Sequence, residues 1–202
     1  MIEPYGPKQA LSSSRGERSE LNGLSEPERR TMRSLVIGAG LSVVLLLGMV
    51  VLDRALKTPA APAGIISFEL VGTFAGAQSI MDSWDEPARI QAGISLGLDF
   101  FFLLAYAYTL AGACRLVAAR IAPNRLRVLG KVLAWGAWGA ALLDTIENLA
   151  LIQLLIGHAE TWHPRLAALC AWPKFGLAGG ALLYIFTGGV LMFWARRKDA
   201  DI

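Results

Sequence analysis

Four long apolar runs, separated by shorter polar segments, dominate the pattern of hydrophobic and polar positions along this chain. The runs cover residues 35–52, 90–113, 132–156 and 166–194. A helix rises about 1.5 Å per residue and the hydrocarbon core of a bilayer is about 30 Å thick, so each run is about long enough to span it. The pattern predicts an all-α integral membrane protein built as a four-transmembrane-helix bundle.

A weaker apolar segment, about residues 66–84, lies between the first two runs. In a helix, Leu70, Phe74 and Met81 would share one face, and Glu69 would lie near the other. The segment is short and polar for a membrane span. We expect an additional amphipathic helix between spans one and two, at the outer surface or tucked into the mouth of the bundle, with Glu69 in water. The alternative is that Glu69 and Gln78 contribute to a lid over the site.

Polar segments flank the membrane domain, which we place at residues 35–195. Residues 1–34 read as a polar cytoplasmic tail, and residues 196–202 as a second one. Near the end of the first tail, Ser25 precedes Glu26 and Pro27, the pattern of a helix start. We expect that helix to continue into the first span.

Composition supports a membrane protein and excludes a nucleic-acid partner. The chain has 202 residues, of which 54% are hydrophobic and 17% charged, too apolar for a soluble domain of this length. The net charge of +3 comes from basic residues confined to a few segments, without interleaved aromatic residues. The expected partner is the lipid bilayer. Small residues spaced four apart, such as Gly93 and Gly97, favour close helix packing and leave open a homo-oligomer or other membrane subunits.

The distribution of lysine and arginine predicts the orientation. Six precede the first span, five lie between spans two and three, and three follow span four, against three and one in the other connections. Basic loops favour the cytoplasmic side, so both termini should be cytoplasmic in a multi-pass protein of the plasma membrane, the inner membrane of a bacterium. Tryptophans fit interfacial belts, Trp84 and Trp162 on the outer side and Trp135, Trp138 and Trp194 on the inner side.

Charged residues interrupt three of the four spans. Asp99 lies in the second, Asp144 in the third and Lys174 in the fourth. A charge near the bilayer centre costs at least about 2.5 to 3.5 kcal/mol, so such residues are rarely idle. Glu147 and Asn148 follow Asp144 at i+3 and i+4, which puts all three on one helix face. Counted along the helices, these residues lie at compatible depths, and one shared cluster is expected.

Three carboxylates against one ammonium leave a formal charge of −2 in this cluster. Protons, a bound cation or the cationic group of a ligand would have to offset it. Phe102 and Tyr106 share the helix face of Asp99 and offer an aromatic wall for an amine or a lipid tail. The candidate ligand-binding residues are Asp99, Tyr106, Asp144, Glu147, Asn148 and Lys174. The alternative is structural, with Lys174 paired to one acid and the polar groups joining helices.

Known catalytic and cofactor motifs are absent from the sequence, so whether the chain is an enzyme stays open and no cofactor is expected. His158, Glu160 and His163 share a loop, but His-x4-His there is weak support for a metal ion, and we expect no metal site.

Two functions therefore remain. The first is a small polytopic membrane protein whose buried acidic and lysine cluster binds a proton, a cation or an amphiphilic ligand. The alternative is a non-catalytic accessory or assembly subunit of a larger membrane protein complex.

Overall fold

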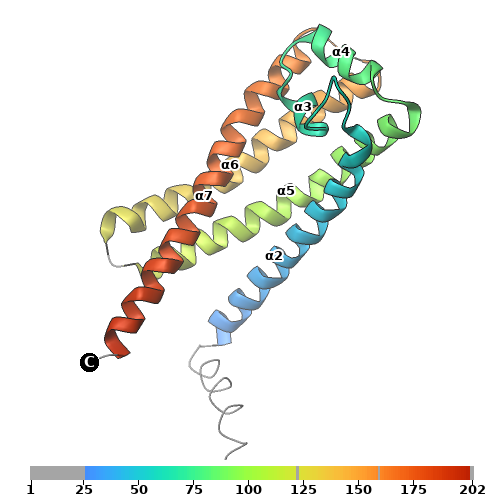
Figure 1. Ribbon diagram of the computed structural model, residues 1–202. Coiled ribbons are helices and arrows are strands. Elements are labelled where there is room, and N and C mark those ends of the chain that lie inside the picture. Colours follow the sequence, from blue (N-terminus) through green and yellow to red (C-terminus); the bar gives the residue numbers. More distant parts are fainter. Residues whose placement is uncertain (1–25, 122, 159, 201–202) are drawn as a thin grey trace, which may run out of the picture.

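A computed structural model describes residues 26–121, 123–158 and 160–200, without side chains for residues 195–200. Every regular element in this part of the chain is helical (Figure 1). The elements are α2 (Glu26–Leu52), η1 (Asp53–Leu56), α3 (Ile65–Leu70), α4 (Phe74–Asp82), α5 (Glu86–Arg120), α6 (Asn124–Leu155) and α7 (His163–Ala200).

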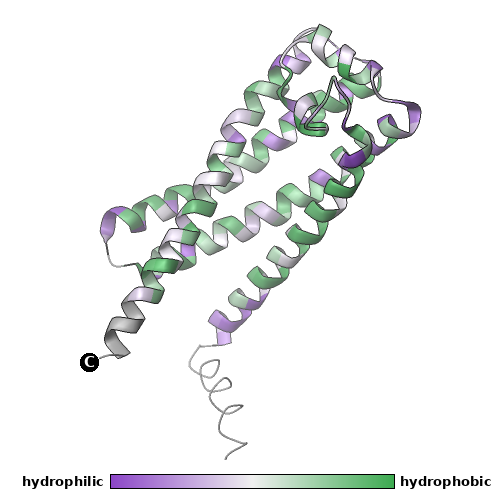
Figure 2. Ribbon diagram, viewed as in Figure 1, coloured by the Kyte–Doolittle hydropathy of each residue, from purple (hydrophilic) through white to green (hydrophobic). Residues whose placement is uncertain are grey.

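Four helices, α2 continued by η1, α5, α6 and α7, are long and apolar enough to cross a membrane. They coincide with the four apolar runs, so the all-helical class and the four candidate spans are confirmed. Figure 2 shows the hydrophobic colour along most of their length. Helix α2 begins and α7 ends at the end of the bundle away from α3 and α4 (Figure 1). Most of the predicted N-terminal tail lies outside the described residues.

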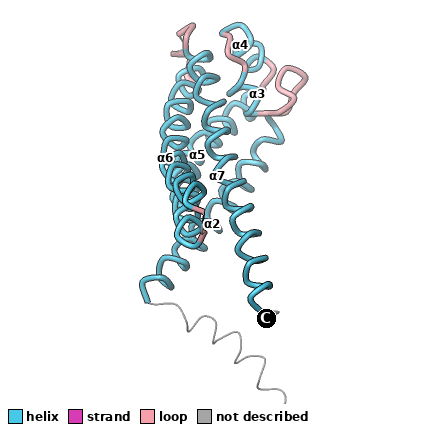
Figure 3. The backbone as a smooth tube through the Cα atoms, turned by 90° about the vertical axis from the view of Figure 1, so that its left-hand side faces the viewer, coloured by secondary structure: helices cyan, strands magenta, loops and turns pink. Residues whose placement is uncertain are grey.

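The prediction of one amphipathic helix over residues 66–84 is wrong, because the segment forms two helices, α3 and α4. The chain turns between them at Gly72, whose φ is +64°. The side chain of Thr73 then accepts a hydrogen bond from the backbone N–H of Gly76 and caps α4. Both helices fold over one end of the bundle, where most of the loops lie (Figure 3). Phe68 and Ala77 are fully buried there, so the segment is tucked into the bundle mouth.

Helix α2 lies at the edge of the molecule, whereas α5, α6 and α7 pack together. It contacts α5 and η1 and does not pack extensively against α6 or α7. Leu35 is the buried residue of α2, and it fits beside Gly112 of α5, where any added side chain would collide with it. Gly38 makes a similar close approach to Thr109. The other residues of α2 are exposed or half-buried.

Close approaches of the other helices occur at some of the small residues spaced four apart and not at others. A side chain added at Gly136 of α6 would lie 3.2 Å from Leu177 of α7. A side chain added at Gly93 or Gly97 would meet no atom, so this pair does not form a helix contact within the chain. Gly130 lies against the ring of Tyr184 instead, and Gly188 lies against Val117. These contacts hold α6, α7 and α5 together at the end of the bundle opposite α3 and α4.

Trp84 is a core residue and not part of an interfacial belt, which corrects that expectation. Only 3% of it is exposed, and its indole N–H donates a 2.9 Å hydrogen bond to the carbonyl of Leu56. Its ring also meets the ring of Phe68 edge-on, with centroids 5.2 Å apart. Through these two contacts, Trp84, which lies just before α5, holds η1 and α3 against the start of that helix. The other four tryptophans expected in belts are exposed, namely Trp135, Trp138, Trp162 and Trp194.

The apolar core is divided. One cluster, which includes Phe68, Leu96 and Leu151, lies under α3 and α4. A second cluster, which includes Cys114 and Tyr184, lies toward the other end of the bundle. A third, smaller cluster is formed by Leu103, Ala107 and Ala141. The charged residues of the predicted spans are buried in the interior between the first two clusters.

Candidate ligand-binding site

Lys174 of α7 is held by two carboxylates of α6. Its Nζ donates to Asp144 Oδ1 over 2.7 Å and to Glu147 Oε1 over 2.8 Å, and all three side chains are buried. The two acids reach the same ammonium because a spacing of three residues places them on one face of α6. One cation is therefore shared by two acids.

The remaining predicted residues join the same site from α5 and α6. Asn148 Nδ2 donates to Asp99 Oδ2 over 2.6 Å, and the hydroxyl of Tyr106 donates to Asp144 Oδ2 over 3.1 Å. All six residues singled out from the sequence thus lie together between α5, α6 and α7. That they bind a ligand stays a prediction.

Glu69 of α3 belongs to this site, although the sequence interpretation placed it in water. It is only 8% exposed, and its Oε2 lies 3.6 Å from Lys174 Nζ, within ion-pairing range but beyond a good hydrogen bond. Burial raises the pKa of Glu69 above its ordinary value, and the nearby Lys174 only partly opposes that effect. The signal that could have revealed it is an acid placed directly between the large apolar residues Phe68 and Leu70.

Asp53 fixes the start of the short helix that carries Glu69. Its Oδ1 accepts a 2.7 Å hydrogen bond from the backbone N–H of Ile65, the first residue of α3. Gly64, just before it, has a φ of +60°, and a side chain there would collide with the Asp53 carboxylate. The turn at Gly64 therefore sets where α3 begins and where Glu69 points.

A cavity of about 230 Å³ adjoins the polar residues. Its polar wall is formed by Asp53, Glu69, Asp99, Tyr106, Asp144 and Lys174. Its apolar wall comes from α2, α3 and α7, namely Leu46, Met49, Val50, Ile65, Ile66, Phe175 and Ala178. The cavity therefore joins buried charges to a hydrocarbon surface.

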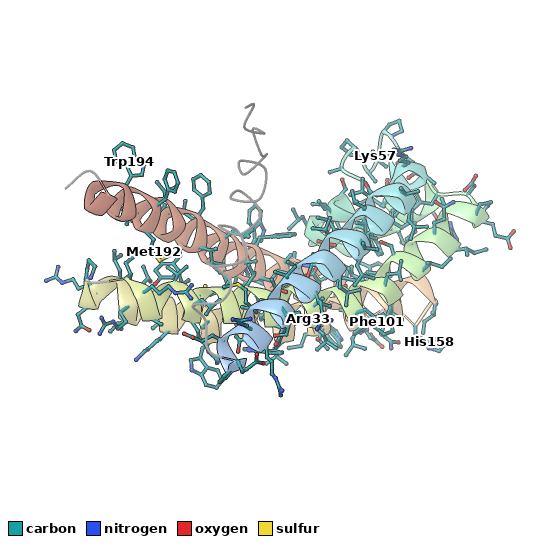
Figure 4. All side chains as sticks on the ribbon, turned by 90° about the horizontal axis from the view of Figure 1, so that it is seen from below. Arg33, Lys57, Phe101, His158, Met192 and Trp194 are labelled. Atoms are coloured by element: carbon teal, nitrogen blue, oxygen red, sulfur yellow. The ribbon has the colours of Figure 1, made fainter. Side chains whose placement is uncertain are left out.

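The side of the cavity between α2 and α7 is poorly covered. Leu46 and Val50 of α2 are 45% and 50% exposed, and Phe175 of α7 is 43% exposed. In the view from below, Arg33 near the start of α2 and Trp194 near the end of α7 lie well apart (Figure 4). Beside the cavity, these partly exposed side chains leave an opening between α2 and α7 to the outer surface of the helices.

The cluster carries excess negative charge and unused hydrogen-bonding capacity. Four carboxylates, of Glu69, Asp99, Asp144 and Glu147, face one ammonium, which gives a formal charge of −3 if all are ionised. In the described chain, Glu69 Oε2, Glu147 Oε2 and Asn148 Oδ1 are buried without a hydrogen-bond partner. Buried polar atoms are normally paired, so these mark places where protons, water or a ligand complete the site.

His163, at the start of α7, makes local contacts with its neighbours in the chain. His163 Nδ1 accepts a 2.8 Å hydrogen bond from the backbone N–H of Glu160, and its ring lies 4.1 Å from that of Trp162. Over residues 26–121, 123–158 and 160–200, three or more His, Cys, Asp or Glu side chains are nowhere grouped as a metal ion would require.

No protein-family model, curated protein or solved structure matches this chain. Its function has to be inferred from the arrangement of these side chains.

Proposed function

We propose that this chain is a multi-pass membrane protein, with both termini in the cytoplasm, that binds an amphiphilic ligand at its buried acidic and lysine cluster. The observation that carries the proposal is the cavity, which brings the cluster and the apolar faces of α2, α3 and α7 into one space. A ligand with a polar head and an apolar tail matches both walls at once.

The size of the cavity favours an amphiphile over a proton or a bare cation. Water occupies about 30 Å³ of liquid volume per molecule, so a space of about 230 Å³ is far larger than a proton or a simple ion would need. It is also smaller than the roughly 300 to 1,000 Å³ of a pocket that encloses a whole drug-sized molecule. The cavity fits a headgroup and the first part of a tail. The remainder of the tail leaves between α2 and α7.

Photolabelling in nanodiscs tests this proposal. The probes are dodecyl chains with a diazirine in the chain and an ammonium, hydroxyl or carboxylate head. Labelling is expected on α2 around Leu46 and Val50, and on α7 around Phe175. Val50→Trp, which fills the opening, should reduce it several-fold. The matched control is Val51→Trp, because Val51 is 58% exposed and does not line the cavity.

Two results would contradict the proposal. One is labelling by every probe that simply follows lipid exposure along all four long helices. The other is an equal response of the two tryptophan variants, because Val50 and Val51 differ in whether they line the cavity.

A further inference from the structure

We infer that the head of the ligand is a protonated amine, seated between Glu69 and Asp99 and carried on a long apolar chain. The inference rests on the proposed function and adds the chemical class of the ligand. It follows from a comparison of the hydrogen-bond donors and cations that each of the four carboxylates of the site contacts.

Asp144 and Glu147 are already matched to a cation. Each accepts a hydrogen bond shorter than 3 Å from Lys174 Nζ. Asp144 also accepts from the hydroxyl of Tyr106. An ammonium has three N–H donors, and two of those on Lys174 are spent on these two acids. These carboxylates and Lys174 therefore satisfy much of one another's charge.

Glu69 and Asp99 lack an equivalent partner. Asp99 receives its hydrogen bond from Asn148, which is neutral. Glu69 Oε2 is buried, has no hydrogen-bond donor in the described chain, and lies 3.6 Å from an ammonium that already serves two other acids. Both carboxylates line the cavity. The unmatched negative charge of the site is thus exposed to the same empty space.

A primary ammonium fits this space better than other cations. It can donate N–H hydrogen bonds to both carboxylates, whereas a quaternary ammonium has none to donate. The walls of the cavity include the rings of Phe175 and Tyr106, and aromatic faces attract a desolvated cation. Phe175 already lies 5.0 Å from Lys174 Nζ, which shows that its ring is turned toward the charged part of the site.

An apolar chain on the amine is implied by the opposite wall. Leu46, Met49 and Val50 of α2 offer no hydrogen-bonding side chain, and the opening beside them leads to the lipid-facing surface. A small hydrophilic amine would leave this surface uncovered. A long-chain amine would cover it and could enter from the bilayer without crossing α3 and α4.

The test compares three probes with one tail on the purified full-length chain: dodecylamine, dodecyltrimethylammonium and dodecanol. Their equilibrium affinities are measured in nanodiscs. Dodecylamine should bind about tenfold more tightly than the other two, since hydrogen bonds to charged groups are worth more than neutral contacts. Glu69→Gln and Asp99→Asn should each remove most of that preference. Glu86→Gln is the control, because Glu86 is an exposed acid that does not line the cavity.

The outcomes separate this inference from the proposal on which it rests. Equal affinity for amine and trimethylammonium, or for amine and alcohol, would overturn the amine assignment; if Val50→Trp still weakens binding, amphiphile binding stands. Binding of none of the probes would overturn both. The comparison on the unmodified protein remains decisive even if a cluster variant fails to fold.

Discussion

Asn148 and Asp99 form a 2.6 Å hydrogen bond between α6 and α5, with both side chains buried in the interior of the bundle. The amide is the donor, so it stabilises the carboxylate without adding a charge. Together with the bond from Tyr106 to Asp144, it links α5 to the acidic face of α6.

Replacing Asn148 with Ala should destabilise the protein by about 1 to 2 kcal/mol, because Asp99 would lose its donor in a buried site. The comparison is Thr145→Ala, which removes a hydroxyl bonded only to the backbone of its own helix. Unfolding in mixed detergent would measure both free energies. Equal effects of the two changes would contradict the structural importance of the bond to Asp99.

Replacing Lys174 with Gln should be far more damaging. It removes the cation shared by Asp144 and Glu147, and breaking a buried ion pair typically costs about 3 to 5 kcal/mol. Adding Asp144→Asn and Glu147→Gln to that variant should recover much of the loss. Lys57→Gln is the control, since the Lys57 side chain is 57% exposed and its 3.7 Å pair with Asp53 is worth about 1 kcal/mol or less. Folded yield and unfolding in detergent would report the difference.

The stability of the ligand-free protein should fall as pH rises from about 4.5. The pKa of Glu69 is raised in the folded state, so the folded protein holds this proton more tightly than the unfolded chain. The stabilising contribution is complete below the ordinary carboxyl pKa and is lost as pH rises through the raised value. Lys174, Asp144 and Glu147 face Glu69 from α7 and α6, and Asp99 and Asp53 line the same cavity. Glu69→Gln should flatten the curve of melting temperature against pH, and parallel curves would contradict the assignment.

A side chain introduced at Gly64 should weaken ligand binding and also lower the stability of the fold. Gly64→Ala places a side chain at positive φ and against the Asp53 carboxylate, which disturbs the start of α3 and so the position of Glu69. Gly157→Ala has a similar backbone strain at φ +79° but meets no neighbouring atom. Both should lose about 1 to 3 kcal/mol of stability. Only Gly64→Ala should weaken dodecylamine binding, and loss of binding in both would point to a general loss of fold.

Cysteine labelling should place the two ends of the bundle on opposite sides of the membrane. Both native cysteines, Cys114 and Cys170, are buried, so background labelling should be low. An impermeant maleimide added to intact cells should modify Lys57→Cys and should modify Arg125→Cys only after permeabilisation. The reverse pattern would invert the orientation that the basic loops predict.

Local spacing made most of the site predictable. Asp144, Glu147 and Asn148 must share a face of any helix that contains them, and the lengths of the spans bring Asp99 and Lys174 to the same depth. The position of Glu69 depends instead on turns at Gly64 and Gly72, which fold α3 back onto α7. The spacing of apolar residues along the sequence does not indicate where the chain folds back in this way.

The position of α2 at the edge of the bundle could not be predicted from the sequence either, because four apolar runs do not reveal which helices contact each other. One sign of it is present: the first run is the most hydropathic of the four. A helix that packs against few others needs fewer polar residues to join it to them.

The hydrogen bonds of the polar cluster all join α5, α6 and α7, whereas α2 supplies only apolar atoms to the cavity. The apolar wall is completed by α3 and α7, which also carry Glu69 and Lys174, so α2 is the long helix that borders the cavity without joining the cluster. Under the proposed function, substitutions along α2 would therefore change the contacts to the tail of the ligand and leave the contacts to its head in place.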